Sequence, residues 1–219
     1  MVSLSQQVRR QDRYAAVLED AEGARLKLTI PDEVVLKFRL REGDELDAAR
    51  VHALRDLADR SLAFDRGVAA LAARDRSAKE LERWLVRRGF SQEHAQGAVA
   101  KLTALGVVDD GRFAREHVRR RVSGSGASVW RLRRELARKG VDRTVADAAI
   151  ADTLAEAGTD DLAMARREGA KKWRSLSRLE RDVARRRLLG FLRRRAFSGD
   201  VVRAVVAELV RGDGASRRA

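Results

Sequence analysis

Arginine and lysine gather in two stretches of this sequence, and they are the residues best suited to binding chemistry. Residues 115–139 hold nine basic and two acidic residues, and residues 171–195 hold eleven basic and two acidic. Guanidinium and ammonium groups bind phosphate oxygens through charge-assisted hydrogen bonds, so the predicted chemistry is recognition of a phosphate-rich polymer. The candidate contact residues are Arg87 and, within the two stretches, Arg119, Arg120, Arg121, Arg131, Arg134, Arg138, Lys171, Lys172, Arg185, Arg186, Arg187 and Arg194.

A run of charge is most often a solvated helix face. Nine net positive charges in the 25 residues 171–195 are costly to leave uncompensated, however, and this favours an anionic partner. Trp130 and Trp173 lie among these cations, where an indole ring can stack on a base or fill a pocket of a partner. Packing inside its own repeat is the favoured interpretation for each tryptophan.

Catalysis has little support in the sequence. The three histidines, His52, His94 and His117, lack metal-ligand spacing and are predicted to be ordinary helix-surface residues. There is no cysteine, no glycine-rich phosphate loop and no nucleophile motif. We therefore expect no catalytic residue, no metal and no cofactor.

The charge is unevenly distributed along the chain. The 219 residues include 47 Lys+Arg and 33 Asp+Glu, a formal net charge of +14. Residues 1–60 hold 11 basic and 12 acidic residues, so residues 61–219 have a net charge of +15. A nucleic acid is the first candidate partner and an anionic membrane the second. No run approaches the roughly 20 apolar residues needed to span a bilayer, and there is no signal peptide, so we expect a soluble cytoplasmic protein.

A sequence motif that occurs three times, called the phrase below, indicates the helices that must position these cations. Its first leucines are Leu81, Leu132 and Leu188, spaced by 51 and 56 residues. Each copy has two leucines four apart, two basic residues, a small residue, an apolar residue and a capping residue. A period near 50 predicts repeated supersecondary units. The predicted structural residues of the phrase are Trp84, Leu85, Leu136 and Leu192 in the core, and Gly89 and Gly140 at left-handed helix ends. Ala196 replaces glycine in the third copy.

The composition and the capping residues predict a mainly α protein. One proline and abundant Ala, Leu and Arg favour helices. We expect three tandem three-helix repeats in an elongated array, preceded by a small β-hairpin and helix segment. The predicted divisions are residues 1–62 for the N-terminal segment, 63–108, 109–157 and 158–211 for the repeats, and 212–219 for a disordered tail. The first helices of the repeats are predicted at residues 64–74, 111–122 and 160–174.

The N-terminal segment shows a different pattern. Residues 1–13 are predicted to be disordered, and residues 14–18 and 25–30 to pair as a hairpin around Gly23. A short helix follows Pro31, and residues 46–62 are expected to form a connecting helix. Residues 123–126, rich in glycine and serine, are predicted to be flexible.

The chain resembles the RecX family, regulatory proteins of the bacterial RecA recombinase. The resemblance rests on Arg-Gly-Phe at 88–90, on Leu-Gly-Val-Val-Asp-Asp-Gly-Arg-Phe-Ala at 105–114, and on the phrases at 131–141 and 191–197. It implies a monomeric, non-enzymatic protein that binds RecA–DNA filaments and single- and double-stranded DNA. It also implies inhibition of RecA ATP hydrolysis, strand exchange and coprotease activity during recombination and the response to DNA damage.

Two alternatives remain at this point. One is a helical DNA-binding protein or transcriptional regulator that acts without RecA, and the other is a scaffold for acidic proteins. The equivalent residues Arg87, Arg138 and Arg194 lie beside the leucine stripe of each repeat, where their side chains can face outward. Repetition of this basic flank favours a partner that is itself periodic.

Overall fold

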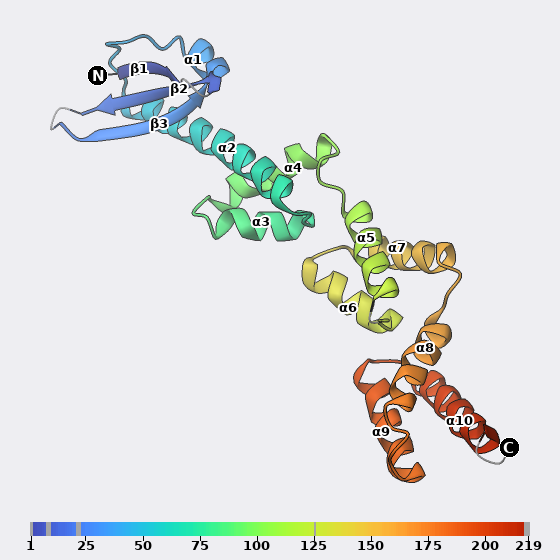
Figure 1. Ribbon diagram of the computed structural model, residues 1–219. Coiled ribbons are helices and arrows are strands. Elements are labelled where there is room, and N and C mark those ends of the chain that lie inside the picture. The colour runs from blue at the N-terminus through green and yellow to red at the C-terminus, as the bar shows by residue number, and fades with distance from the viewer. Residues whose placement is uncertain (1, 8–9, 21–22, 125, 217–219) are drawn as a thin grey trace. The chain divides into compact units, whose positions relative to one another are not determined.

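The computed structural model describes residues 2–7, 10–20, 23–124 and 126–216 (Figure 1). It divides into two compact units, which we call the N-terminal unit (Met1–Val108) and the C-terminal unit (Asp109–Ala219). The described residues contain one antiparallel sheet of three strands and ten helices. The prediction of a mainly α protein with a small N-terminal sheet is therefore confirmed. Each unit is described by itself below.

The sheet of the N-terminal unit has the order β1 (Val2–Gln7), β2 (Arg10–Glu19), β3 (Arg25–Pro31). The predicted hairpin is confirmed, since β2 pairs with β3 from Arg13↔Pro31 to Glu19↔Arg25. The prediction of disorder for residues 1–13 is wrong for β1 and the start of β2. β1 pairs with β2 through its backbone, as in Leu4↔Ala16, and this pairing is independent of the polar side chains that suggested disorder.

Two helices follow the sheet, α1 (Asp32–Phe38) and α2 (Ala48–Ala73). The prediction of two separate helices at 46–62 and 64–74 is wrong, because α2 is continuous. Residues 62–64 are Leu-Ala-Phe, which include neither a cap nor a helix breaker. Leu54 of α2 packs in the core under the sheet, and Ala63 packs in the core of the first repeat.

The first repeat is completed by α3 (Ala78–Val86) and α4 (Gln92–Ala104). Ser77 Oγ accepts from the backbone N–H of Glu80 at 3.1 Å and Ser91 Oγ from that of His94 at 3.0 Å, so both helices have a side-chain cap at their start. Leu81 and Leu85 are fully buried. Gly89 has φ +95°, as predicted for a left-handed residue at the end of this helix.

The C-terminal unit contains the second and third repeats. Its helices are α5 (Asp110–Ser123), α6 (Val129–Lys139), α7 (Arg143–Glu156), α8 (Asp161–Arg174), α9 (Arg181–Arg194) and α10 (Gly199–Ser216). Leu132 and Leu136 of α6 and Leu188 and Leu192 of α9 are all fully buried in a single core that continues through both repeats. The two repeats of this unit therefore fold against each other.

The turns after α6 and α9 adopt the same backbone conformation with different residues. Gly140 has φ +80°, and Ala196 has φ +62° at the equivalent turn. A left-handed alanine costs roughly 1–2 kcal/mol relative to glycine. The third copy of the phrase therefore keeps the turn at some energetic cost.

The two segments that were predicted to be flexible each include helical residues. Of residues 123–126, Ser123 ends α5 and Gly126 is buried, while Ser125 lies outside the described residues. The backbone of α10 continues to Ser216, so the predicted tail is helical at residues 212–216, and residues 217–219 lie outside the described part.

Candidate anion-binding surface

One face of α9 is basic and the opposite face is buried. Ala184, Leu188 and Leu192 point into the core. The residues at 183, 186, 187, 190 and 194 follow the spacing of a single helix face. Together with Lys172 of α8 they line a groove of about 570 Å³, which we call the basic groove: Lys172, Val183, Arg186, Arg187, Gly190 and Arg194.

Gly190 leaves the middle of the basic groove open. A Cβ atom at this position would lie 3.2 Å from Arg194 Nη1, so this guanidinium would have to shift by a few tenths of an ångström. Glycine in a helix interior costs about 1 kcal/mol relative to alanine. Gly190 thus lowers the helix propensity of α9 at the point where it lines the basic groove.

The cations of the basic groove are little compensated within the protein. Among the described residues no carboxylate lines the groove. Arg186 Nε donates to the backbone oxygen of Asp182 at 3.4 Å, and Lys172 Nζ lies 5.8 Å from the centre of the Phe191 ring. In the part of the chain that the structure describes, the guanidinium groups of Arg187 and Arg194 have neither a hydrogen-bond nor an ion-pair partner. The groove is suited to several phosphate oxygens.

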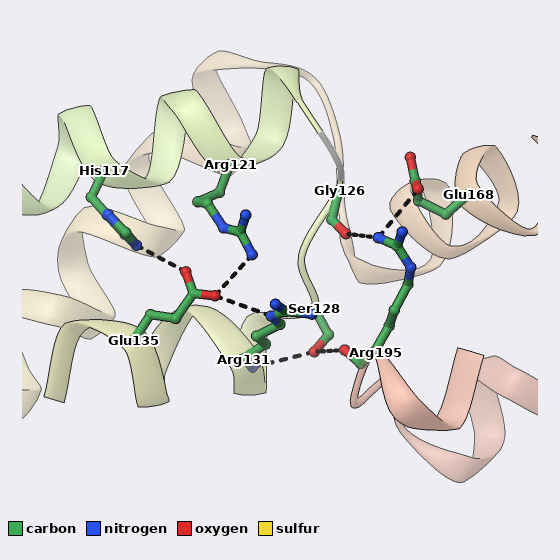
Figure 2. Close-up of polar contacts among 8 residues, drawn as sticks. All are labelled: His117, Arg121, Gly126, Ser128, Arg131, Glu135, Glu168 and Arg195. Atoms are coloured by element: carbon green, nitrogen blue, oxygen red, sulfur yellow. Dashed lines mark hydrogen bonds and ion pairs between the residues drawn. The ribbon is translucent and has the colours of Figure 1, made fainter. Parts of the chain in front are cut away.

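The first basic stretch is organised around a buried carboxylate. Glu135, 9% exposed, accepts from Arg121 Nη2 at 2.8 Å and from Arg131 Nε at 3.0 Å, and His117 Nε2 lies 3.0 Å from its other oxygen (Figure 2). Arg131 and Glu135 lie one turn apart on α6, which brings their side chains together. Burial acts to raise the pKa of Glu135, but the hydrogen bonds from Arg131 and His117 and the charge of Arg121 hold it below its usual range.

Other arginines of this stretch are also neutralised. Arg119 bonds Glu116 at 2.5 Å and Glu156 at 3.0 Å, and these carboxylates raise its pKa. Arg133 Nε donates to Asp147 Oδ1 at 2.6 Å. Glu156 and Asp147 come from α7, outside the basic stretch. Carboxylates therefore neutralise Arg119, Arg121, Arg131 and Arg133 of this stretch.

A second buried carboxylate joins the two repeats of the C-terminal unit. Glu168, 4% exposed, lies 3.3 Å from Arg195 Nη1, which also donates to the carbonyl of Gly126 at 3.3 Å (Figure 2). Ser128 Oγ donates to the Arg195 carbonyl at 2.9 Å and accepts from the backbone N–H of Arg131 at 3.2 Å. These contacts fix the start of α6 against the end of α9.

The equivalent cations Arg88, Lys139 and Arg195 each lie over an aromatic ring. Arg88 Cζ is 4.8 Å from the Trp84 ring centre, and Arg195 Cζ is 4.6 Å from that of Phe191. In the second repeat Glu135 occupies the place of the aromatic residue, and Lys139 Nζ lies 5.3 Å from the Phe113 ring. Trp84 is partly buried against the core of its repeat, as predicted.

The remaining candidate residues are dispersed. Arg87, Arg120, Arg134 and Arg138 are exposed, and Arg87 belongs to the N-terminal unit. Lys171 Nζ lies 3.7 Å from Glu168, and Arg185 Nε lies 3.6 Å from Asp182. The structure thus brings together Lys172, Arg186, Arg187 and Arg194, and not the whole set. Gly190 was missed, although its position on the basic face of α9 is visible in the sequence.

The prediction of ordinary surface histidines is correct for His52 and wrong for the other two. His94 Nε2 lies 2.8 Å from Asp56 Oδ1. His117 is half-buried, and burial lowers its pKa despite the hydrogen bond to Glu135. In the described part of the chain, no three His, Cys, Asp or Glu residues form a group that could hold a metal ion, and no helix is long and apolar enough to cross a membrane.

Trp130 does not pack inside its repeat. It is 52% exposed, contrary to the favoured interpretation, whereas Trp173 is partly buried against the core. Arg134 Cζ lies 4.6 Å from the centre of the Trp130 ring.

Three family models match the chain, described as the first, second and third three-helix domains of RecX, over residues 63–102, 109–150 and 159–206. A regulatory protein RecX from Amycolatopsis mediterranei (strain U-32) is 37% identical over 145 residues, covering 66% of this chain and 81% of its own. A regulatory protein RecX from Mycobacterium marinum is 37% identical over 144 residues, and the match covers 64% of this chain and 80% of the relative.

Solved structures show the same fold. A crystal structure of regulatory protein RecX has a TM-score of 0.73 at 21% identity, covering 94% of this chain and 98% of its own. A crystal structure of RecX from Lactobacillus salivarius has a TM-score of 0.59 at 22% identity, and the match covers 69% of this chain and 96% of that structure.

Proposed function

This chain belongs to the RecX family of regulatory proteins, and on that premise we propose that it binds the filament of RecA on DNA. Binding restrains ATP hydrolysis, strand exchange and coprotease activity of RecA during recombination and the response to DNA damage. The protein acts as a monomer in the cytoplasm, through binding rather than catalysis.

The basic groove is the observation that supports this proposal most. Four cations of α8 and α9 face a groove of about 570 Å³ that no carboxylate of the described residues enters. A nucleoprotein filament presents phosphate groups at regular intervals, and its affinity for a cationic surface comes from release of counterions.

The repeated basic flank supports a periodic partner over a single operator. Arg87, Arg138 and Arg194 occupy equivalent positions in the three repeats, and all three are exposed. A protein that reads one operator concentrates its base contacts on a recognition helix. Cations at the same position of each repeat are better suited to a partner whose own units repeat.

The proposal is tested by measuring DNA-dependent ATP hydrolysis by RecA with this protein added at stoichiometric amounts. The wild-type chain is expected to lower the rate. With the double variant R187E/R194E, most of the uninhibited rate of ATP hydrolysis should return. Circular dichroism should show the same helicity for this variant as for the wild type.

A matched control is R55E/R66E, which makes the same change in net charge on exposed positions of α2. It should inhibit like the wild type. No effect of the wild-type chain on hydrolysis would refute the proposal, and an equal reduction of inhibition in both double variants would refute the role of the groove. A footprint on one duplex sequence without RecA would favour a transcriptional regulator instead.

A further inference from the structure

The solvent face of α6 combines one aromatic residue with a row of cations. Trp130, Arg134 and Arg138 are exposed, at the spacing of one helix face, while Leu132, Glu135 and Leu136 form the buried face. Arg133 lies beside this face and donates to Asp147 Oδ1 at 2.6 Å. From Trp130 to Arg138 this face extends about 12 Å along the helix axis.

Arg134 gives Trp130 a charged neighbour as well as a packing partner. Its guanidinium carbon lies 4.6 Å from the ring centre, the distance of a cation–π contact. Trp130 still exposes 52% of its surface. An indole held on one side by a cation needs to lose little side-chain freedom when a second flat group stacks on it.

The first turn of α6 is also held rigidly. Ser128 Oγ connects the helix start to the Arg195 carbonyl at 2.9 Å, and the backbone N–H of Val129 donates to Asp161 Oδ1 at 2.8 Å. Trp130 follows immediately, so its backbone is fixed to both repeats of the C-terminal unit.

The surroundings of Trp130 do not suit an apolar partner. The other large hydrophobic residues with high exposure lie in the N-terminal unit, at Leu36, Val68, Val86, Leu105 and Val107. Among the described residues of the C-terminal unit, Trp130 alone has this exposure, so it is not part of an apolar patch. Its neighbours on the same helix face are arginines.

We infer that Trp130 stacks on an unpaired nucleobase of a single-stranded nucleic acid, with Arg134 and Arg138 beside the phosphates. Single-strand-binding proteins combine stacking aromatic residues with a basic surface along the backbone. Bases of a duplex are already stacked on each other, so the platform favours single strands. The inference deepens the proposed function by naming the unpaired base as a ligand, and it rests on that function only for the nucleic-acid partner.

The test compares equilibrium binding of three fluorescent probes by fluorescence anisotropy: a 20-nucleotide oligothymidylate, an abasic strand of the same length, and a duplex. Trp130→Ala is expected to weaken oligothymidylate binding about tenfold. It should leave the abasic and duplex affinities unchanged, and Trp130→Phe should retain most of the binding. R187E/R194E should weaken all three.

Equal weakening of the thymidylate and abasic probes by Trp130→Ala, or no weakening of either, would overturn the inference. Loss of binding to RecA–DNA filaments with oligothymidylate affinity unchanged would also overturn it, because the ring would then contact RecA. The assay needs no RecA, so a failed filament proposal and a failed stacking inference give different results.

Discussion

In residues 115–139 the side chains of Arg119, Arg121, Arg131 and Arg133 contact carboxylates, whereas in α8 and α9 four cations line a groove that no described carboxylate enters. The two basic stretches are similar in the sequence, with nine and eleven basic residues against two acidic residues each. The carboxylates that neutralise the first stretch include Asp147 and Glu156 of the distant helix α7. A count of charge along the chain therefore does not identify a binding surface, because compensation depends on tertiary neighbours.

The largest effect is expected from charge reversal in the basic groove. R187E/R194E should weaken DNA binding on the order of 100-fold near 0.1 M salt, because two attractive interactions with phosphates become repulsive. The slope of log affinity against log salt should fall by about 0.7 to 0.9 for each phosphate that the variant no longer neutralises. Titrations at several salt concentrations measure both quantities.

The matched variant in the first stretch is R119E/R133E, which makes the same charge change at neutralised arginines. Its DNA affinity should fall much less, and its salt slope should stay close to that of the wild type. If both double variants reduce the affinity equally, the distinction between the two stretches is wrong.

A smaller effect, on stability, is expected at the buried carboxylate of the first stretch. Glu135→Gln removes the charge that Arg121, Arg131 and His117 share, and should lower the free energy of unfolding by about 2 kcal/mol, the scale of a hydrogen bond to a charged group. Urea unfolding measures this change. Glu116→Gln alters an exposed pair with Arg119, which is worth at most about 1 kcal/mol. A larger cost for Glu116→Gln than for Glu135→Gln would contradict the assignment of a structural role to Glu135.

Substitution of Gly190 in the basic groove should change DNA binding and stability in opposite directions. Gly190→Ala should raise the free energy of unfolding by about 1 kcal/mol through helix propensity, and should weaken DNA binding slightly, because the Arg194 guanidinium must shift by a few tenths of an ångström. Gly97→Ala in α4 is the control, because a Cβ there meets nothing within 4 Å. Gly97→Ala should raise the free energy of unfolding and leave DNA binding unchanged. A Gly190→Ala variant that binds DNA as the wild type does would show that the groove need not be open.

The repeats could be predicted from the sequence because their signals are local. The leucine spacing, the caps at Ser77, Ser91 and Asp142, and the left-handed glycines all depend on neighbours within a few residues. β1 was not predicted, because its side chains are mostly polar and its pairing with β2 is made by the backbone. Arg121 and Arg131 were predicted as contact residues, and their engagement with Glu135 depends on how α5 packs against α6.

The basic groove was partly predictable, because part of its signal is also local. Arg186, Arg187 and Arg194 lie on one helix, so helical periodicity places them together. Lys172 comes from α8, and only the packing of α8 on α9 brings it to the groove. The exposure of Trp130 also depends on tertiary packing, and this is why the favoured prediction of a packed ring was wrong.

The smallest effect expected is a pH dependence of stability that belongs to the first stretch alone. Burial lowers the pKa of His117 below its ordinary value of 6.5, while Glu135 of α6 acts to raise it and Lys139 and Arg120 act to lower it. The unfolded chain therefore binds a proton below about pH 6.5 that the folded chain resists. This contribution to stability is complete above pH 6.5 and is lost as the pH falls through the lower folded pKa.

The lowered pKa of Glu135 acts in the same direction at more acid pH, below its ordinary 4.5. Partial burial raises the pKa of Asp161, which opposes this effect there. Measurements between pH 7.5 and 5.5 avoid these carboxylates, and the part of the pH dependence that is lost in a His117 variant belongs to His117. Urea unfolding of the wild type should show stability falling with pH across this range, and His117→Gln, which can still donate to Glu135, should show a flatter profile.

The groove variant R187E/R194E should keep the wild-type slope, because its residues are not near this histidine's partners. A wild-type stability that rises toward pH 5.5, with a flat His117→Gln profile, would mean that the attraction of Glu135 for the histidine proton outweighs burial, and would reverse the sign of the effect.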